Sequence, residues 1–274
     1  MQMVTVGPFE LAAPVGRGGM AEVWHGRSVR DAHRVAVKIL TSDHAPTAEE
    51  TAAFRREVRA VAGLSHPGIV AVYDHGEIDE AAAAASAGAL GAGCPYLVME
   101  LASGTLDDLE LPLPWPSTRA VLLALLDALA YAHARGIVHR DLKPANVLRV
   151  AGVDGREGLR LADFGIAHAL NRHTGPAASA NVRGTASYMA PEQATNAWRD
   201  FGPWTDLYAL GCVAFQLASG KMPFTGKTIM ALLLHHMSTA APPLEAPEDY
   251  PPAFADWVAR LLHKAPLDSY RRAA

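Results

Sequence analysis

The sequence is poor in cysteine, in charged residues and in long apolar runs, and each shortage excludes a class of protein. Only two cysteines, Cys94 and Cys212, occur among 274 residues; they are far apart and lack metal-site spacing, so we expect reduced thiols in a cytoplasmic protein. Charged residues make up 19% of the chain and the net charge is −4, so the sequence lacks the excess of basic residues that nucleic-acid binding requires. The most apolar run, residues 121–130, is too short to span a bilayer and contains Asp127.

The first six residues also lack a basic segment followed by an apolar one, so no signal peptide is expected. Half of the residues are hydrophobic, as in a compact globular protein with a sizeable core. No internal repeat is apparent. The length suits one large domain or two small lobes.

The first hundred residues are predicted to be rich in strands. Alternating apolar residues and polar or glycine turns predict short strands at residues 9–15, 21–27, 34–40, 69–73 and 96–100. One helix is expected among them, with Thr47 and Glu50 as a capping box and Phe54, Val58, Val61 and Leu64 as its inward stripe. Residues 79–93, mostly alanine and glycine, are expected to form a mobile loop.

Helices are predicted to dominate after Thr105. Expected helices span residues 117–135, capped by Ser117, 206–218, capped by Thr205, and 254–263, with Gly136 and Gly220 past the first two ends. Residues 147–150 and 159–162 are expected to form a hairpin closed around Asp154 and Gly155. The predicted fold class is therefore α+β, with a small antiparallel-sheet lobe at residues 1–101 and a larger helical lobe at residues 102–274.

A glycine-rich turn, Gly16-Arg-Gly18-Gly19, lies between the first two long strands. Glycines let a backbone approach a polyphosphate closely, but alone such a run is more often an ordinary turn. It is followed by a strand, which argues against a Rossmann fingerprint, and it lacks the Gly-Lys-Ser/Thr ending of a Walker loop.

Lys38 lies inside an apolar strand and shares a face with Ala36 and Leu40. It is either a snorkelling lysine or a ligand for the α- and β-phosphates of a nucleotide, with small Ala36 leaving room for a flat base. Glu57 favours the second interpretation, because it falls on the buried stripe of the predicted helix. A carboxylate there needs a cation, and Lys38 is the obvious candidate.

The stretch His139-Arg-Asp141-Leu-Lys143-Pro-Ala-Asn146 carries the strongest chemical signal. Asp141 can accept a proton from a substrate hydroxyl, and Lys143 can stabilise charge on a transferring phosphate. Asn146 and Asp163 are oxygen ligands suited to Mg²⁺. His235-His236 lacks zinc-site spacing, so a surface or packing role is expected.

These residues, with Asp163-Phe-Gly and Ala190-Pro-Glu192 further on, resemble the eukaryotic-like protein kinase family. The residues of the glycine-rich motif and of Pro191-Glu192-Gln193 are similar to those of bacterial members. The resemblance covers residues 9–270 and implies ATP and Mg²⁺ as cofactors, with Mn²⁺ as an alternative metal. It implies nucleotide contacts at Gly16, Gly18, Gly19, Val23, Ala36, Lys38, Met99, Glu100, Leu101 and Leu148. Lys38–Glu57 resembles the family's ion pair, Asp141 the catalytic aspartate, Asn146 and Asp163 the metal ligands, and Asp206 the aspartate that braces the catalytic loop.

Lys143-Pro144 and Gly184-Thr185 resemble the Ser/Thr branch, which implies protein substrates with Ser or Thr acceptors and places Thr185 in the substrate loop. Arg140 resembles the arginine of kinases whose activation loop is ordered by phosphorylation. Ser179 and Thr174 are the predicted acceptors for autophosphorylation in signalling, for which a kinase dimer is considered.

The sequence departs from the family most at Ser269, where an arginine that pairs with the equivalent of Glu192 is usual. Arg271 or Arg272 could substitute. This departure keeps a pseudokinase open as an alternative to an active enzyme, and a small-molecule kinase is a third possibility. Residues 111–116 are proline-rich where the family has a short helix. We expect a fragment of a longer protein, because the chain stops directly afterwards.

Overall fold

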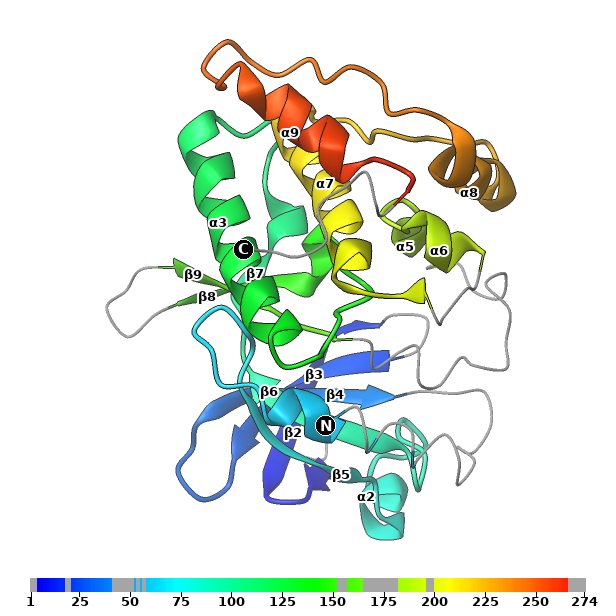
Figure 1. The fold of residues 1–274 in the computed structure, drawn as a ribbon. Helices are drawn as coiled ribbons and strands as arrows, with labels where there is room; N and C mark the ends of the chain where they lie inside the picture. Colours follow the sequence, from blue (N-terminus) through cyan, green and yellow to red (C-terminus); the bar gives the residue numbers. More distant parts are fainter. Residues whose placement is uncertain are drawn as a thin grey trace. The chain divides into compact units, whose positions relative to one another are not determined.

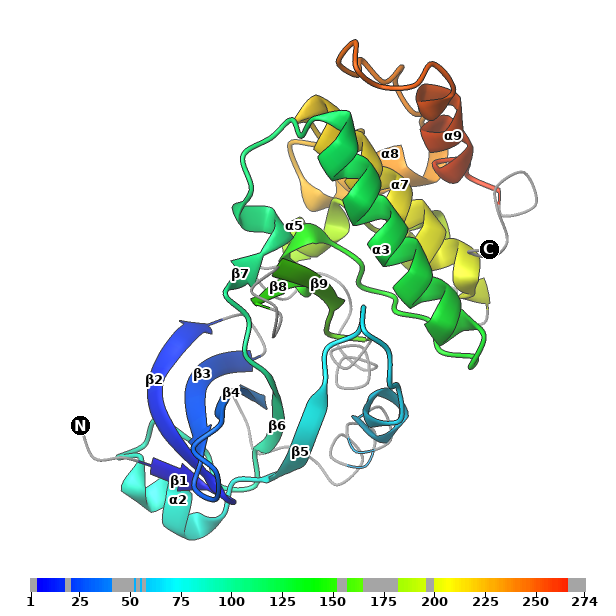
Figure 2. The ribbon, with the colours of Figure 1, turned by 90° about the vertical axis from the view of Figure 1, so that its left-hand side faces the viewer.

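The computed structural model describes residues 4–17, 21–40, 52, 55, 58–151, 157–164, 182–195 and 200–265. These residues divide into two compact units (Figures 1 and 2). The first contains the described residues up to 65 together with 70–103, and the second contains 66–69 and the described residues from 104 onward. Each unit has its own secondary structure and is considered separately.

The first unit is an antiparallel sheet of six strands in the order β1-β2-β3-β4-β6-β5. Its strands are β1 (Val4–Val6), β2 (Phe9–Arg17), β3 (Ala21–Ser28), β4 (Arg34–Leu40), β5 (Val72–Glu77) and β6 (Pro95–Glu100). Figure 2 shows how strongly the sheet curls. Four of the five predicted strands are confirmed, with end shifts of at most two residues.

Of the fifth predicted strand, residues 69–73, only the last two residues lie in a strand. Ile69 makes only an isolated parallel bridge to Leu161, and β5 begins at Val72 instead. Ile69 belongs to the second unit, where the N–H of Leu161 donates to the carbonyl of Gly68. Ile69 and Val70 are buried, but they belong to different units and precede the strand rather than forming part of it.

The core of the first unit lies on one face of the sheet. Val37 of β4 and Val98 of β6 are fully buried there, together with Val6 of β1. Gly26 of β3 is needed beside Val37, because a Cβ at that position would lie 2.9 Å from the Val37 side chain. A second apolar cluster joins Leu40, Leu97 and Val58. In the region of the predicted helix, residues 52, 55 and 58–62 are helical. Phe54 and the predicted capping pair Thr47 and Glu50 lie outside the described residues.

The mobile loop expected at residues 79–93 is also wrong. It contains helix α2 (Glu80–Ala85), whose N-cap Asp79 accepts a 2.7 Å hydrogen bond at Oδ1 from the N–H of Ala82. Ala82 and Leu90 are buried in the core of the first unit. Alanine has the highest helix propensity, so a capped alanine run with two buried anchors folds where its composition alone indicated a linker.

The second unit begins with a short sheet of β7 (Gly104–Thr105), β8 (Val147–Ala151) and β9 (Glu157–Leu161), and β8 and β9 form the predicted hairpin. Its turn at Asp154 and Gly155 lies outside the described residues. Two 3-10 turns, Leu106–Asp108 and Pro144–Asn146, accompany the sheet. The helices are α3 (Trp115–His133), α5 (Val182–Ala186), α6 (Pro191–Ala194), α7 (Pro203–Ser219), α8 (Ile229–Ser238) and α9 (Ala253–Leu261).

Helix α7 is the core of this unit. Thirteen of its residues are buried, so it is apolar on every side, as a central helix must be. Helices α3 and α9 both pack against it (Figure 1). A Cβ at Gly211 would lie 2.8 Å from the Leu261 Cβ, so this glycine permits the close approach of α9. No helix in the described part of the chain is long and apolar enough to cross a membrane.

Both predicted helix caps in this unit are wrong, whereas the glycine ends are confirmed. The N-cap of α3 is Pro114, and the N–H of Trp115 donates to Asp249 Oδ2 over 2.7 Å. The N-cap of α7 is Gly202, whose N–H donates to Thr205 Oγ1. Gly136 (φ +72°) and Gly220 (φ +69°) both adopt the left-handed conformation. The α+β class predicted from the sequence is confirmed, with the sheet first and the larger helical part after it.

Helix α8, which no pattern in the sequence predicted, buries Leu232, Leu233 and His236. The His236 side chain is fully buried, with Nδ1 3.1 Å from the Tyr208 hydroxyl and its ring beside Phe224. The expected packing role is confirmed. Burial lowers the pKa of His236 to about 4.

Replacement of Asp79 tests the cap of α2. Asp79→Ala is expected to lower the free energy of unfolding by about 1 kcal/mol, because the N–H of Ala82 loses its acceptor. Asp79→Asn is the matched control and should stay close to the parent, since its amide oxygen still accepts. Urea denaturation measures both. Equal stability of the alanine variant and the parent would contradict the assignment.

Buried neutral His236 predicts acid sensitivity. The pKa of His236 in the folded state is below that of the unfolded chain. The contribution of His236 to the free energy of unfolding is therefore intact above about pH 6.5 and is lost as the pH falls toward about 4. The loss is about 3 kcal/mol in the limit of low pH. His236→Gln should flatten the pH dependence of unfolding in this window. His235→Gln, a change at an exposed neighbour, should retain it. Identical slopes for the two variants would disprove this account.

Candidate active site

The β8–β9 hairpin brings two predicted metal ligands to one end of the sheet. Val147 pairs with Leu161, and the next step of the ladder is a 2.9 Å bond from the Ala162 N–H to the Asn146 carbonyl. Asn146 therefore lies opposite Ala162, and Asp163 follows directly. Asp163 is half-buried and has φ +63°, a conformation that a non-glycine residue holds only when its surroundings impose it.

Two of the four predicted catalytic residues, Asp141 and Lys143, are hydrogen-bonded to each other. Lys143 Nζ donates to Asp141 Oδ2 over 2.8 Å, and the two side chains are only 20% and 16% exposed. The same Nζ donates to Thr185 Oγ1 over 2.9 Å. The structure therefore joins the neighbouring Asp141 and Lys143 to Thr185, which lies 42 residues after Lys143.

Asn146 completes this cluster and its amide orientation follows from its partners. Nδ2 donates to the Asp141 carbonyl over 2.7 Å and to Asp141 Oδ2 over 3.0 Å. Because a carbonyl only accepts, the nitrogen must face Asp141, which leaves the amide oxygen for another partner. No hydrogen bond from the described residues reaches Asp141 Oδ1.

His139 connects the catalytic stretch to the hairpin. Its fully buried ring donates from Nε2 to the Ala162 carbonyl over 2.8 Å and accepts at Nδ1 from the N–H of Asp141 over 3.2 Å. These partners select the neutral tautomer protonated on Nε2. The ring also lies 4.6 Å from that of Phe164. His139 thereby fixes the backbone on both sides of the site.

Asp206 of α7 fixes the other side of the stretch. Its carboxylate is buried and accepts from the backbone N–H groups of His139 and Arg140, each over 2.8 Å. His133 Nε2 adds a third contact at 2.7 Å. This is the bracing role that the resemblance implied. The three donors offset the cost of burying the charge.

The backbone at Arg140 is held in an unusual conformation. Its φ is +67°, which costs about 1 kcal/mol or more for a residue with a Cβ. The Asp206 contact holds its N–H, and Gln193 Nε2 donates to its carbonyl over 2.7 Å. The sequence analysis did not identify Gln193, which follows Glu192 directly. Arg140, Asp141, Thr185 and Tyr188 also line a shallow pocket in this unit.

Glu192 is anchored by a residue that the sequence analysis took for a cap. Thr205 Oγ1 donates to Glu192 Oε1 over 2.6 Å while accepting from Gly202. Burial raises the pKa of Glu192, and the Thr205 hydrogen bond opposes the shift. Ser269, Arg271 and Arg272, which the family comparison connects with this glutamate, lie outside the described residues.

The predicted nucleotide ligands of the first unit lie on its strands. Lys38 is half-buried on β4 between Val23 of β3 and Leu97 of β6. Ala36 pairs with Met99 and is buried. Gly16 lies near the end of β2, with open space where a Cβ would be; Glu100 ends β6, and Leu101 follows it. Gly18, Gly19, Glu57, Thr174 and Ser179 fall outside the described residues, so the Lys38–Glu57 pair stays a prediction.

A family model described as "Protein kinase domain" matches residues 9–271. The chain belongs to the protein kinase family. Serine/threonine-protein kinase PknB of Mycobacterium leprae is 37% identical over 271 residues, which cover 97% of this chain and 41% of that protein. PknA of Mycobacterium tuberculosis is 36% identical over 270 residues, 97% of this chain and 58% of the relative.

Solved structures agree with this membership. The crystal structure of the PknI kinase domain of Mycobacterium tuberculosis superimposes with a TM-score of 0.68 at 26% identity, over 100% of this chain and 95% of that one. These relatives support the resemblance to bacterial Ser/Thr kinases. The kinase chain spans only 41% of the PknB relative and 58% of the PknA relative.

Replacement of Asp206 tests the brace. Asp206→Asn puts an NH₂ group where an oxygen accepted, so a buried N–H loses its partner and the free energy of unfolding should fall by about 3 kcal/mol. Asp200→Asn, at an exposed residue ahead of the same helix, should change it by less than about 0.5 kcal/mol. Urea unfolding followed by circular dichroism measures both. A loss below about 1 kcal/mol for Asp206→Asn would remove the brace from this account.

Proposed function

We propose that this chain is a Ser/Thr protein kinase that transfers the γ-phosphoryl group of ATP to Ser and Thr hydroxyls of proteins. The observation that carries the proposal is the cluster of Asp141, Lys143, Asn146 and Thr185. It combines a base with a free oxygen, a cation and a hydroxyl-bearing residue of the substrate loop within hydrogen-bond distance. Phosphoryl transfer needs this combination, because it depends on positioning and on neutralising charge.

Asp141 is the residue that orients the acceptor hydroxyl. Its Oδ2 is occupied by Lys143 and Asn146, so Oδ1 accepts the hydroxyl hydrogen and takes the proton as the oxygen attacks. Lys143, held against Asp141, supplies positive charge near the transferring phosphoryl group. Its contact with Thr185 connects the base with the segment proposed to receive the protein substrate, which favours a Ser/Thr acceptor.

The second unit offers a donor set that fits Mg²⁺. The free amide oxygen of Asn146 and the carboxylate of Asp163 lie at the same end of the hairpin, and hard oxygen ligands are what this cation requires. We propose these two residues as its ligands, with Mn²⁺ as an alternative ion. When bound, the metal ion would neutralise charge on the phosphates.

The proposed ATP contacts are those that the resemblance to the kinase family implies. Lys38, paired with Glu57, would bind the α- and β-phosphates, and the other contacts are Gly16, Gly18, Gly19, Val23, Ala36, Met99, Glu100, Leu101 and Leu148. The location of Lys38 on a strand, half-buried and next to small Ala36, supports this role. The lobe boundary between residues 101 and 102, the cytoplasmic location and the signalling role belong to the same proposal.

Asp141→Asn is expected to reduce turnover at least ~10²-fold, because the variant keeps the shape of the side chain but loses the base. Asp256→Asn, at an exposed position of α9, is the matched control and should keep the parental rate. Transfer of radiolabelled phosphate from ATP to a generic basic protein measures both. Unchanged transfer by Asp141→Asn would refute the role, and an inactive parent that still binds ATP would favour a pseudokinase.

Autophosphorylation is expected at Ser179 or Thr174. Incubation with ATP and Mg²⁺ should add phosphate there, with a rate that rises with protein concentration if a transient kinase dimer is the reacting species. Mass spectrometry of the digested protein locates the sites, and the Asp141→Asn variant provides the background. An active protein with both residues unmodified would contradict this part of the proposal.

A further inference from the structure

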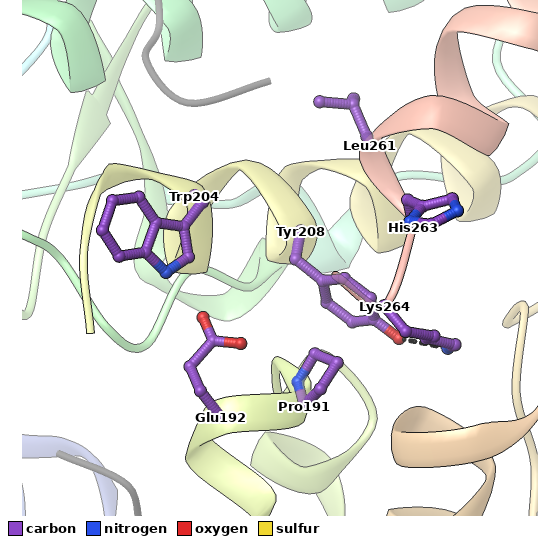
Figure 3. A pocket seen from close by; sticks show the side chains of 7 residues that line it. All are labelled: Pro191, Glu192, Trp204, Tyr208, Leu261, His263 and Lys264. Carbon is purple, nitrogen blue, oxygen red and sulfur yellow. Dashed lines mark hydrogen bonds between the residues drawn. The ribbon is translucent and has the colours of Figure 1, made fainter. Parts of the chain in front are cut away.

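Lys264, just after α9, has an unusual environment for a lysine (Figure 3). It is half-buried, and its Nζ donates to the Tyr208 hydroxyl over 2.8 Å. The same atom lies 3.9 Å from the centre of the Phe224 ring and 5.1 Å from that of Tyr208. The amine is therefore held by a phenol and two aromatic faces rather than surrounded by water.

No carboxylate in the described part of the chain lies within 4.0 Å of Lys264 Nζ. An ammonium in such a place lacks the partner that normally offsets its burial. Burial lowers the pKa of Lys264 to about 8, and the nearby Cys212 thiol opposes the shift only in part. The titratable groups around it are Tyr208 and Cys212 of α7, His236 of α8, Glu192 of α6 and the adjoining His263.

The Lys264 side chain is partly exposed. Lys264 lines a small pocket with Pro191, Trp204 and Leu261, and in Figure 3 its side chain extends past Tyr208, away from the Glu192 carboxylate. Its hydrogen bond to Tyr208 OH limits its rotamers. An amine that is fixed, poorly hydrated and accessible has the properties of a nucleophilic lysine.

We propose that Lys264 is a covalent modification site for acyl phosphates, separate from the proposed kinase site. The lone pair of the neutral Nζ attacks the carbonyl carbon of the acyl phosphate. The bond between the carbonyl carbon and the oxygen that bridges it to phosphorus breaks, and inorganic phosphate leaves with the bonding electrons. The proton lost by nitrogen passes to water. The product is an uncharged amide, so the modification removes the cation–π interaction of Lys264 with the Phe224 and Tyr208 rings.

The test treats the folded chain with acetyl phosphate and follows acetylation of each lysine by mass spectrometry. Exposed Lys221 is the internal control. At about pH 7.5, Lys264 should react about tenfold faster than Lys221, because burial lowers the pKa of Lys264 and its amine is held in place by Tyr208. The initial rate at Lys264 should reach half its maximum near pH 8.

Two controls separate activation by the fold from simple accessibility. In concentrated urea the advantage of Lys264 over Lys221 should disappear, since the aromatic environment is lost. Lys264→Arg should lose the modified peptide and no other. Equal initial rates at Lys264 and Lys221 in the folded protein would overturn the proposal. So would a Lys264 rate that rises without inflection up to about pH 10.

Discussion

The arrangement of the active site depends on one buried carboxylate, that of Asp206. It accepts from two successive backbone N–H groups, those of His139 and Arg140, and from the His133 ring. A carboxylate out of water must have such donors. Once they are satisfied, the chain that precedes Asp141 has little freedom left, and the position of the proposed base follows from a residue 65 positions further on.

The constraint continues beyond Asp206 through hydrogen bonds of the neighbouring segments. Held at its N–H, Arg140 adopts φ +67°, and Gln193 fixes its carbonyl. His139 carries the constraint to the Ala162 carbonyl and hence to the residue before Asp163. The catalytic stretch, the hairpin, α6 and α7 are therefore connected by polar groups whose replacement by apolar ones would leave buried donors unpaired. Strain at Arg140 and Asp163 is located at the site itself, where function requires fixed geometry.

The sequence predicted elements whose signal is local. Strand β4 matches its expected bounds because its apolar residues Val35, Val37 and Ile39 recur at every second position, as in a strand. The end of α7 follows from Gly220, which adopts the left-handed conformation just past the helix. Predictions failed where tertiary contacts decide. Pro114 is the N-cap of α3 because Asp249, far along the chain, accepts from Trp115, and residues 80–85 form a helix because Ala82 is buried in the core of the first unit.

The same distinction applies to the site. Asp141, Lys143 and Asn146 are close in sequence, so their cluster could be predicted from spacing and resemblance. The contacts of Thr205 with Glu192 and of Gln193 with Arg140 join distant segments, and no local pattern marks them. Lys264 begins the stretch in which Ser269 departs from the family, but the sequence assigns Lys264 itself no role; its neighbours Tyr208 and Phe224 make it distinctive.

The most direct test of the central claim is the single-turnover rate of phosphoryl transfer by Asp206→Asn, measured at a temperature where circular dichroism shows it folded, together with its affinity for ATP. If Asp206 acts by positioning Asp141, the rate should fall by ~10²-fold while the dissociation constant of ATP changes by less than about threefold. A folded variant that transfers phosphate at the parental rate would contradict the account.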